Sequence, residues 1–364
     1  MGTPRTAGRP AADRTPSARP PRGARVTRED VARLAGVSTA VVSYVLNDGP
    51  RPVAEQTAER VREAVRLLDY RPNSSARALR RGSSDILGLV VADGLNPFFG
   101  EYTAALVSAA GAVGQRLLIA DSCGDPDTEK ASIEDLVTRQ IDGLFLAGHL
   151  MSLPSTAWGD ADSVPLVLID SPGPIPGRLT VGASAEKGAR ELVSHLAVAH
   201  QYRRIGIIVG EAGFGDPDPR MRGWEQALGS ARLPLGPVAR APFTREGGHR
   251  AGQELLDTDP RPDAVFATSD QLAIGLLRAI HERGLTVPGD VAVVSYDGTR
   301  ESEYTWPPLT VARQPLAAMA AAAVELMRSP DGASTRHVQI DTDLVLRASC
   351  GCAPLPPSHS ERNP

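Results

Sequence analysis

The side chains in this sequence that could take part in chemistry are placed for binding, and no catalytic motif accompanies them. Asp121 and Asp170 each follow an apolar run typical of a buried strand, where α/β proteins hold their ligands. The sequence has no nucleophile elbow, no G-x-G-x-x-G after the first apolar strand and no G-x-x-x-x-G-K-S/T. A nucleotide-dependent enzyme is therefore disfavoured, and we expect no enzymatic activity.

The cysteines and histidines do not predict a metal site. Three cysteines give no disulfide framework and indicate a reducing compartment. Cys350 and Cys352 are separated by one glycine, which is too close for a typical zinc pair, and they lack histidine partners in the sequence. We expect neither a metal nor a cofactor. Four histidines are dispersed and predicted to be surface or core residues: His149, His195, His200 and His249.

Residues 27–47, TREDVARLAGVSTAVVSYVLN, predict two short helices joined by a tight turn. Thr27 can cap the first helix, Gly36 can end it, and Ser38 can cap a second helix with apolar residues at helical spacing. A helix–turn–helix of this size places its second helix in the major groove of DNA. The alternative is a helical hairpin within a bundle, which its position before a large α/β body disfavours.

The charge distribution favours a nucleic-acid contact at one end of the chain. Residues 1–82 carry a net charge of +8, and the whole chain is −4, so residues 83–364 carry −12. Electrostatic attraction to phosphates is therefore confined to the N-terminal part. No apolar run approaches the roughly 18 residues of a membrane span, and the start has no secretory signal. We expect a cytoplasmic protein without a membrane partner.

The body alternates between strands and helices, which predicts βαβ units and parallel sheets with helices on both faces. Strands are expected at about 86–91, 117–120, 143–147, 164–169, 205–209, 264–267 and 291–295. Helices are expected near 100–114, 128–139, 185–198, 220–231, 247–257, 270–283 and 315–328, after a third N-terminal helix over about 55–68.

Several motifs, taken in order, resemble the lactose-repressor (LacI/GalR) family of bacterial transcription regulators. They are DVARLAGVS, YRPN with ARALRRG, ILGLVV, NPFF, IDGLFLAG, RMRGW, PDAVFATSDQLAIG, VAVVSYDGT and PPLTVARQP. The resemblance runs from about Val26 to Cys350. It implies an α/β fold with an all-α helix-turn-helix headpiece and a two-lobed core of parallel sheets flanked by helices, similar to periplasmic binding proteins.

The resemblance also implies how the chain is divided. We expect a disordered Arg/Pro-rich tail over 1–24, a DNA-binding headpiece over 25–72, a hinge helix over 73–82, an effector-binding and dimerisation core over 83–352, and a flexible tail over 353–364. Within the core, the first lobe would comprise about 85–182 and about 312–328. The second lobe would comprise about 183–308 and the C-terminal segment.

The positions that correspond to family DNA contacts lie in the headpiece and the hinge. Thr39, Ala40 and Tyr44 correspond to positions that meet base edges, and many relatives carry Arg where this chain has Tyr44. The alternative for Tyr44 is a ring folded on the headpiece surface. The remaining predicted DNA contacts, phosphate-binding positions among them, are Thr27, Ser38, Ser43 and Asn47, and Asn73, Ala76 and Leu79 of the hinge.

Leu79 corresponds to the leucine wedge with which the family kinks the operator through the minor groove. The alternative is ordinary packing of Leu79 against the core. An isolated hinge of this length is marginal as a helix, so we expect it to order against DNA or its partner hinge.

The predicted effector site lies between the lobes. Arg220 and Asp297 correspond to an arginine and a carboxylate that hold the effector in relatives, with structural salt bridges as the alternative for each. The other predicted effector contacts are Phe98, Phe99, Asp121, Asp170, Phe243 and Ser269. Ser269 replaces an asparagine usual in the family, and Val181-Gly-Ala-Ser184 lacks the usual acid, so no particular sugar can be assigned.

The function implied is a sequence-specific regulator, a repressor of a catabolic or transport operon, whose affinity for a palindromic operator is switched by a sugar or related polar metabolite. Because the C-terminal tail has no leucine heptads, we expect a homodimer. The alternatives are a ligand-independent regulator with a degenerate cleft, and a solute-binding protein for transport.

Overall fold

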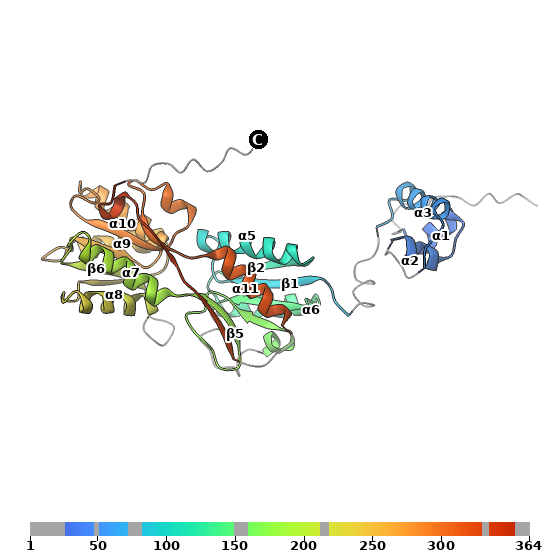
Figure 1. Ribbon diagram of the computed structural model, residues 1–364, viewed down its shortest axis with the longest axis horizontal. Helices are drawn as coiled ribbons and strands as arrows, with labels where there is room; N and C mark the ends of the chain where they lie inside the picture. Colours follow the sequence, from blue (N-terminus) through green and yellow to red (C-terminus); the bar gives the residue numbers. More distant parts are fainter. Residues whose placement is uncertain are drawn as a thin grey trace, which may run out of the picture. The chain divides into compact units, whose positions relative to one another are not determined.

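The computed structural model divides at Gly82–Ser83 into two compact units, which are shown in Figure 1. It describes residues 26–46, 51–71, 82–148, 159–211, 218–329 and 335–353. Within those residues, every helix is too short or too polar to cross a membrane. The predicted tails and most of the hinge, with Asn47, Asn73, Ala76 and Leu79, lie outside the described residues.

The N-terminal unit contains α1 (Arg28–Ala35), α2 (Thr39–Leu46) and α3 (Glu55–Leu67). A capping box begins α1: the amide of Asp30 donates to the Thr27 hydroxyl at 3.3 Å, and the amide of Thr27 donates to the Asp30 carboxylate at 3.0 Å. Gly36 ends α1 in the left-handed conformation, with φ of 66°. The three helices share a small core made of Val31, Ala32, Ala35, Val42, Val61, Ala64 and Tyr70. The predicted helix-turn-helix is confirmed.

The second unit contains two six-stranded sheets, each with helices on both faces. The first lobe has strand order β11-β5-β4-β3-β1-β2 and is parallel throughout. Its strands are β1 (Ile86–Val91), β2 (Arg116–Asp121), β3 (Gly143–Ala147), β4 (Leu166–Leu168), β5 (Leu179–Ala183) and β11 (Arg336–Ile340). One face packs against α5 (Pro97–Ala112) and α11 (Leu316–Arg328), which lie side by side in Figure 1, and the other against α6 (Pro126–Thr138) and η3 (Gly159–Ser163).

The second lobe has strand order β12-β10-β9-β8-β6-β7 and is parallel except for the pair β10–β12. Its strands are β6 (Ile205–Gly210), β7 (Val238–Ala241), β8 (Ala264–Ala267), β9 (Ala292–Asp297), β10 (Thr310–Arg313) and β12 (Asp343–Val345). One face is covered by α7 (Ala185–Val198) and α8 (Pro219–Ser230), the other by α9 (Arg245–Leu256) and α10 (Asp270–Glu282). Short 3₁₀-helices follow as η4 (Arg300–Glu303) and η5 (Ala348–Cys350).

One expectation about the lobes is wrong. The C-terminal segment was assigned to the second lobe, but β11 pairs with β5 in the first sheet, and only β12 and η5 belong to the second lobe. The physical reason is that β11 supplies the edge strand that β5 lacks, and its Val338 and Ile340 pack on the first-lobe core. Five of the observed strands are absent from the sequence prediction: β5, β7, β10, β11 and β12.

The chain passes between the lobes beside three polar residues. Ser184 follows β5, Gln314 follows β10, and Asp341 follows β11. The Ser184 hydroxyl donates to the Asp341 carboxylate at 2.8 Å, and the Ser184 amide donates to the carbonyl of Ile340 at 2.8 Å. Two of the three connections are therefore held together directly, which keeps the ends of the strands in register across the interlobe region.

Gly36→Ala is expected to destabilise the headpiece by about 1 kcal/mol, because an L-residue is strained at this left-handed position. The strain is conformational, since a Cβ at Gly36 would meet no atom within 4 Å. Hydrogen exchange of headpiece amides in the full chain, followed by mass spectrometry, measures the effect. Gly100→Ala in α5 is the matched control: its Cβ also has open space and its φ is not positive, so it should not lower protection. Unchanged headpiece exchange in Gly36→Ala would refute the assignment.

Candidate functional site

The second headpiece helix presents small side chains to solvent. Thr39 and Ala40 are exposed on α2, and Ser43 and Tyr44 are half-buried. Ser38 begins this helix, since its hydroxyl accepts from the amide of Val41 at 3.4 Å. Thr27 and Ser38 therefore cap helices, and both side chains remain exposed at helix N-termini, where phosphates are favoured.

The aromatic pair that follows β1 divides between the core and the surface. Phe98 is 3% exposed and packs in the first-lobe core, and its contact with a ligand stays a prediction. Phe99 is only partly buried and meets the Phe98 ring edge-on, with centroids 5.1 Å apart. Because Asn96 caps α5 through the amide of Phe98, the helix start fixes both rings. Phe99 is thus the more accessible of the two.

Asp121, at the end of β2, organises two neighbouring loops. Its carboxylate accepts from the amide of Gly94 at 2.9 Å and from the amide of Cys123 at 2.9 Å. The side chain is exposed at the carboxyl edge of the first sheet. It fixes the loop that leads into α5.

Arg220 is held by an ion pair at the start of α8. Its Nε and Nη2 donate to the two carboxylate oxygens of Asp218 at 2.9 and 2.7 Å, and its Nη1 donates to the Thr268 carbonyl at 2.8 Å. Burial alone would raise the pKa of Asp218, but the adjacent Arg220 guanidinium holds it below its ordinary value. The pair is 20% and 17% exposed, so its attraction is only partly screened by water.

Two aromatic rings flank the same guanidinium. The Arg220 Cζ lies 5.0 Å from the centroid of Phe243 and 5.5 Å from that of Tyr296, distances typical of cation–π contacts. Gly210, at the end of β6, lies against the Phe243 ring, since a Cβ there would approach ring carbons within 2.5 Å. The sequence predicts Arg220 and Phe243 as site residues but not Tyr296, which approaches the guanidinium from β9.

Asp170 follows β4 in the first lobe and is influenced by the ion pair of the second. Burial and the neighbouring Asp218 raise the pKa of Asp170 to about 7, against the opposing effect of Arg220. Burial and the Asp170 charge also raise the pKa of Tyr102. The two lobes therefore meet electrostatically at this point. They also meet at Arg300, whose amide donates to the Glu101 carboxylate at 2.8 Å.

Asp297 ends β9 with a positive φ of 107° and is 6% exposed. Its carboxylate accepts from the Gln314 side chain at 2.9 Å. Burial and the neighbouring Asp270 raise its pKa well above the ordinary value. Asp270 lies behind it and accepts from the Ser295 hydroxyl, and from the amide and hydroxyl of Thr299, at 2.6 to 2.7 Å.

Ser269 is 2% exposed and caps α10, because its hydroxyl accepts from the amide of Leu272 at 3.3 Å. The Ser269 hydroxyl thus caps a helix in this structure, and its contact with a ligand stays a prediction.

Four buried polar atoms in these segments have no hydrogen-bond partner within the described part of the chain. They are the hydroxyls of Tyr102, Thr268 and Tyr296 and the side-chain oxygen of Gln314. Buried polar groups are normally paired, so such a group requires a partner such as water or a ligand. Three of the four belong to residues that also contact Arg220 or Asp297. Sequence reasoning missed these residues and Asp218, because only tertiary proximity identifies them.

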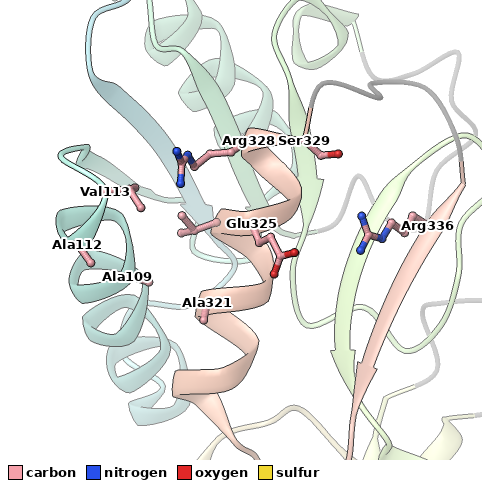
Figure 2. Close-up of a pocket in the computed structure, with 9 residues that line it drawn as sticks. Ala109, Ala112, Val113, Ala321, Glu325, Arg328, Ser329 and Arg336 are labelled. Carbon is pink, nitrogen blue, oxygen red and sulfur yellow. The ribbon is translucent and has the colours of Figure 1, made fainter.

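A separate cavity lies on the outer face of the first lobe. It has a volume of about 530 Å³ and is shown in Figure 2 between the C-terminal halves of α5 and α11 and the strand β11. Its lining is mostly small and apolar, with Glu325, Arg328 and Arg336 at its rim. It contains none of the predicted effector residues and lies at the opposite end of α5 from Phe99. We do not assign it to the site between the lobes.

Known proteins are similar to the chain over nearly all of its described length. Residues 27–73 match bacterial regulatory proteins of the lacI family, and residues 193–350 match the periplasmic binding protein-like domain. The ribose operon repressor of Haemophilus influenzae is 33% identical, covering 89% of this chain and 98% of that protein. The transcriptional repressor CytR of Escherichia coli (strain K12) is 32% identical, covering 90% and 97%.

Two solved structures have the same architecture. The lac repressor dimer bound to operator and the anti-inducer ONPF matches with a TM-score of 0.79 and 26% identity, covering 89% of this chain and 99% of that one. The complex of the transcriptional regulator CelR with cellobiose matches with a TM-score of 0.64 and 27% identity, covering 89% and 100%. With the headpiece, the two lobes and these relatives in agreement, the chain belongs to the lacI family of bacterial regulatory proteins.

Proposed function

We propose that this protein is a homodimeric, cytoplasmic repressor whose operator affinity is switched by a small polyhydroxylated ligand bound between its lobes. The observation that carries the ligand half of the proposal is the Asp218–Arg220 ion pair, set between two aromatic rings and facing unpaired polar groups. The DNA half rests on the helix-turn-helix and on its repressor relatives. We propose binding and not catalysis as the activity.

The chemistry of the site suits a sugar or nucleoside. Asp218 and Thr268 engage three of the five guanidinium N–H donors of Arg220, so one N–H on each terminal nitrogen has no partner among the described residues. Asp170 and Asp297 add acceptors for ligand hydroxyls. The ring faces of Phe243 and Phe99 can cover the apolar face of a sugar ring. The ribose operon repressor and the CelR–cellobiose complex are relatives with ligands of this kind in their names.

The switch is proposed to act through the connections between the lobes. Gln314 belongs to the connection between β10 and α11, and its side chain donates a hydrogen bond to Asp297. A ligand bound at Asp297 would therefore act on that connection through Gln314. A ligand shifts the equilibrium between two lobe arrangements only if it binds one of them more tightly. Contacts from both lobes, with Asp170 on one side and Arg220 on the other, provide that difference.

The ligand-independent alternative is less well supported. A cleft that had lost its ligand would have no reason to keep a partly buried charge pair beside unpaired hydroxyls, because both cost free energy of folding. A transport protein is disfavoured by the match of residues 27–73 to the lacI family.

The combined change Asp218→Asn with Arg220→Gln is expected to abolish ligand binding and leave operator binding intact. Both charges are removed together, so no unpaired charge remains in the cleft. A thermal-shift screen of pentoses, hexoses, disaccharides and nucleosides on the unaltered protein first identifies the ligand. Calorimetry should then show at least a hundredfold weaker binding, about 3 kcal/mol.

Arg222→Gln is the matched control for that change. Arg222 lies on the same helix and pairs with Glu186 at 2.9 Å, on the side of α8 that packs with α7. It should bind the ligand as the unaltered protein does. Normal ligand binding by the double variant would show that the ion pair is not part of the ligand site. Loss of ligand binding in both the double variant and Arg222→Gln would indicate a general effect on α8.

Tyr44→Arg is expected to change the preferred operator base at one position in each half-site towards guanine. An arginine can donate two hydrogen bonds to guanine, and such a pair discriminates by about 1–3 kcal/mol. Selection of sites from a random DNA library by the full chain measures the change. Arg62→Lys on α3 is the control: it keeps the charge and should leave the selected DNA sequence unaltered. If Tyr44→Arg selected the same DNA sequence as the unaltered protein, base contact by residue 44 would be excluded.

Asp170→Asn is expected to stabilise the protein at pH 8 by clearly more than at pH 5. The folded pKa of Asp170 is raised to about 7 from 3.8, so the folded state binds the proton more tightly than the unfolded state does. Stability is therefore lost as the pH rises from about 4 through 7, by about 1.4 kcal/mol per pKa unit at most. Thermal unfolding between pH 5 and 8 tests this, with the exposed Asp160→Asn as control. A difference independent of pH would contradict it.

A further inference from the structure

Four side chains that appear unrelated in the sequence meet at one point of the second lobe. Cys350 ends η5, Cys352 lies two residues later, His195 is in the last turn of α7, and His200 lies just beyond that helix. The expectation that the cysteines lack histidine partners is therefore wrong. The fold supplies the partners from about 150 residues earlier in the chain, which spacing along the sequence cannot reveal.

The four potential ligand atoms form a compact cluster within 4.8 Å of one another. The two histidine Nε2 atoms are 3.1 Å apart, and Cys352 Sγ is 3.3 Å from Nε2 of His200 and 3.4 Å from Nε2 of His195. Cys350 Sγ is 3.6 Å from Nε2 of His195. Each imidazole thus presents its Nε2 atom to the other members of the cluster.

Four of the six separations among these atoms are close to those of a tetrahedral metal site. Zinc bonds of about 2.05 Å to nitrogen and 2.3 Å to sulfur place tetrahedral ligands about 3.3 Å apart for two nitrogens and about 3.6 Å apart for nitrogen and sulfur. The observed separations match those values to within a few tenths of an ångström. Hydrogen bonding alone does not require both imidazoles and both thiols to converge on one centre.

We propose that His195, His200, Cys350 and Cys352 bind one zinc ion as a closed, structural site. Two thiolates and two imidazoles in tetrahedral array select zinc over calcium and magnesium, which prefer oxygen ligands. With four protein ligands no position is left for substrate, so the site is not catalytic. Binding leaves both cysteines as thiolates and releases their protons to solvent.

The surroundings of the cluster suit a metal site. Cys350 is fully buried, and the other three side chains are half-buried, which leaves a route for the ion. The Thr310 hydroxyl lies 3.0 Å from Cys350 Sγ, and the Tyr202 hydroxyl donates to the Cys350 carbonyl at 3.2 Å. Gly351, with φ of 100°, makes the turn that brings both sulfurs to one side. Such outer contacts orient metal ligands.

The proposed ion joins the first and last segments of the second lobe. α7 is the first helix after the chain enters this lobe, and η5 follows its final return from the first lobe through β11 and β12. A zinc ion between them would fix the C-terminal segment, and with it the connection that bonds Ser184. None of the four cluster residues belongs to the proposed effector site.

The experiment measures metal bound to the full-length protein after reconstitution with zinc sulfate and removal of excess by gel filtration. Elemental analysis by mass spectrometry should find one zinc ion per chain. Cys352→Ser should lower the zinc content at least fivefold. Cys123→Ser and His249→Gln are the controls, since these residues lie outside the cluster, and both should keep full occupancy. Substoichiometric zinc in the unaltered protein, or full occupancy in Cys352→Ser, would overturn the proposal.

Two measurements on the unaltered chain guard against a variant that fails to fold. Cobalt(II) in place of zinc should give a thiolate-to-cobalt charge-transfer band and the intense visible bands of tetrahedral coordination. Zinc should also protect the half-buried Cys352 from alkylation while exposed Cys123 continues to react. An octahedral cobalt spectrum, or equal alkylation of Cys352 with and without zinc, would show that the cluster is a set of unliganded side chains.

Discussion

The arrangement of the interlobe region depends on one partly buried guanidinium. Arg220 has its charge compensated by Asp218, its third donor satisfied by a strand-end carbonyl, and its faces covered by Phe243 and Tyr296. Removing a charge of this kind from water is costly unless every surrounding group is matched to it. The start of α8, the loop after β7 and the ends of β8 and β9 are therefore fixed relative to one another by a single side chain.

The acidic groups around this guanidinium differ in their pKa values, because burial opposes its effect to a different extent at each. The guanidinium holds the pKa of Asp218 down, while burial raises that of Asp170 to about 7 and that of Asp297 well above its ordinary value. The cleft thus contains one firmly ionised carboxylate and others whose charge depends on what lies beside them. Ligand hydroxyls that donate to Asp170 or Asp297 would favour the charged forms, so ligand binding at these residues would be accompanied by proton release.

The sequence was sufficient for features that are local or periodic. Apolar runs located β1, β3 and β8, helical spacing located α7 and α10, and the Thr27 and Gly36 signals placed α1 to the residue. It was insufficient where tertiary contacts decide. The strand β7 alternates exposed and buried residues over only four positions, and β11 is defined by the edge of β5 that it completes.

The site shows the same division. Arg220 and Asp297 are predicted from the resemblance of their motifs to the family, but Asp218, Tyr102 and Gln314 acquire meaning only from groups on other elements. The burial of Phe98 but not of Phe99 also depends on packing, because an aromatic pair in a sequence does not reveal which ring the core takes.

The histidine–cysteine cluster is the extreme case of such non-local information. A zinc ligand set is usually recognised by short spacings within each half, and here one half is the pair Cys350 and Cys352 with a single residue between them. The other half straddles the end of α7, so the helix geometry brings His195 and His200 together. Both ends of the lobe must be folded before the four ligands converge. A metal bound there would therefore stabilise only the completed lobe and would link its closure to metal supply.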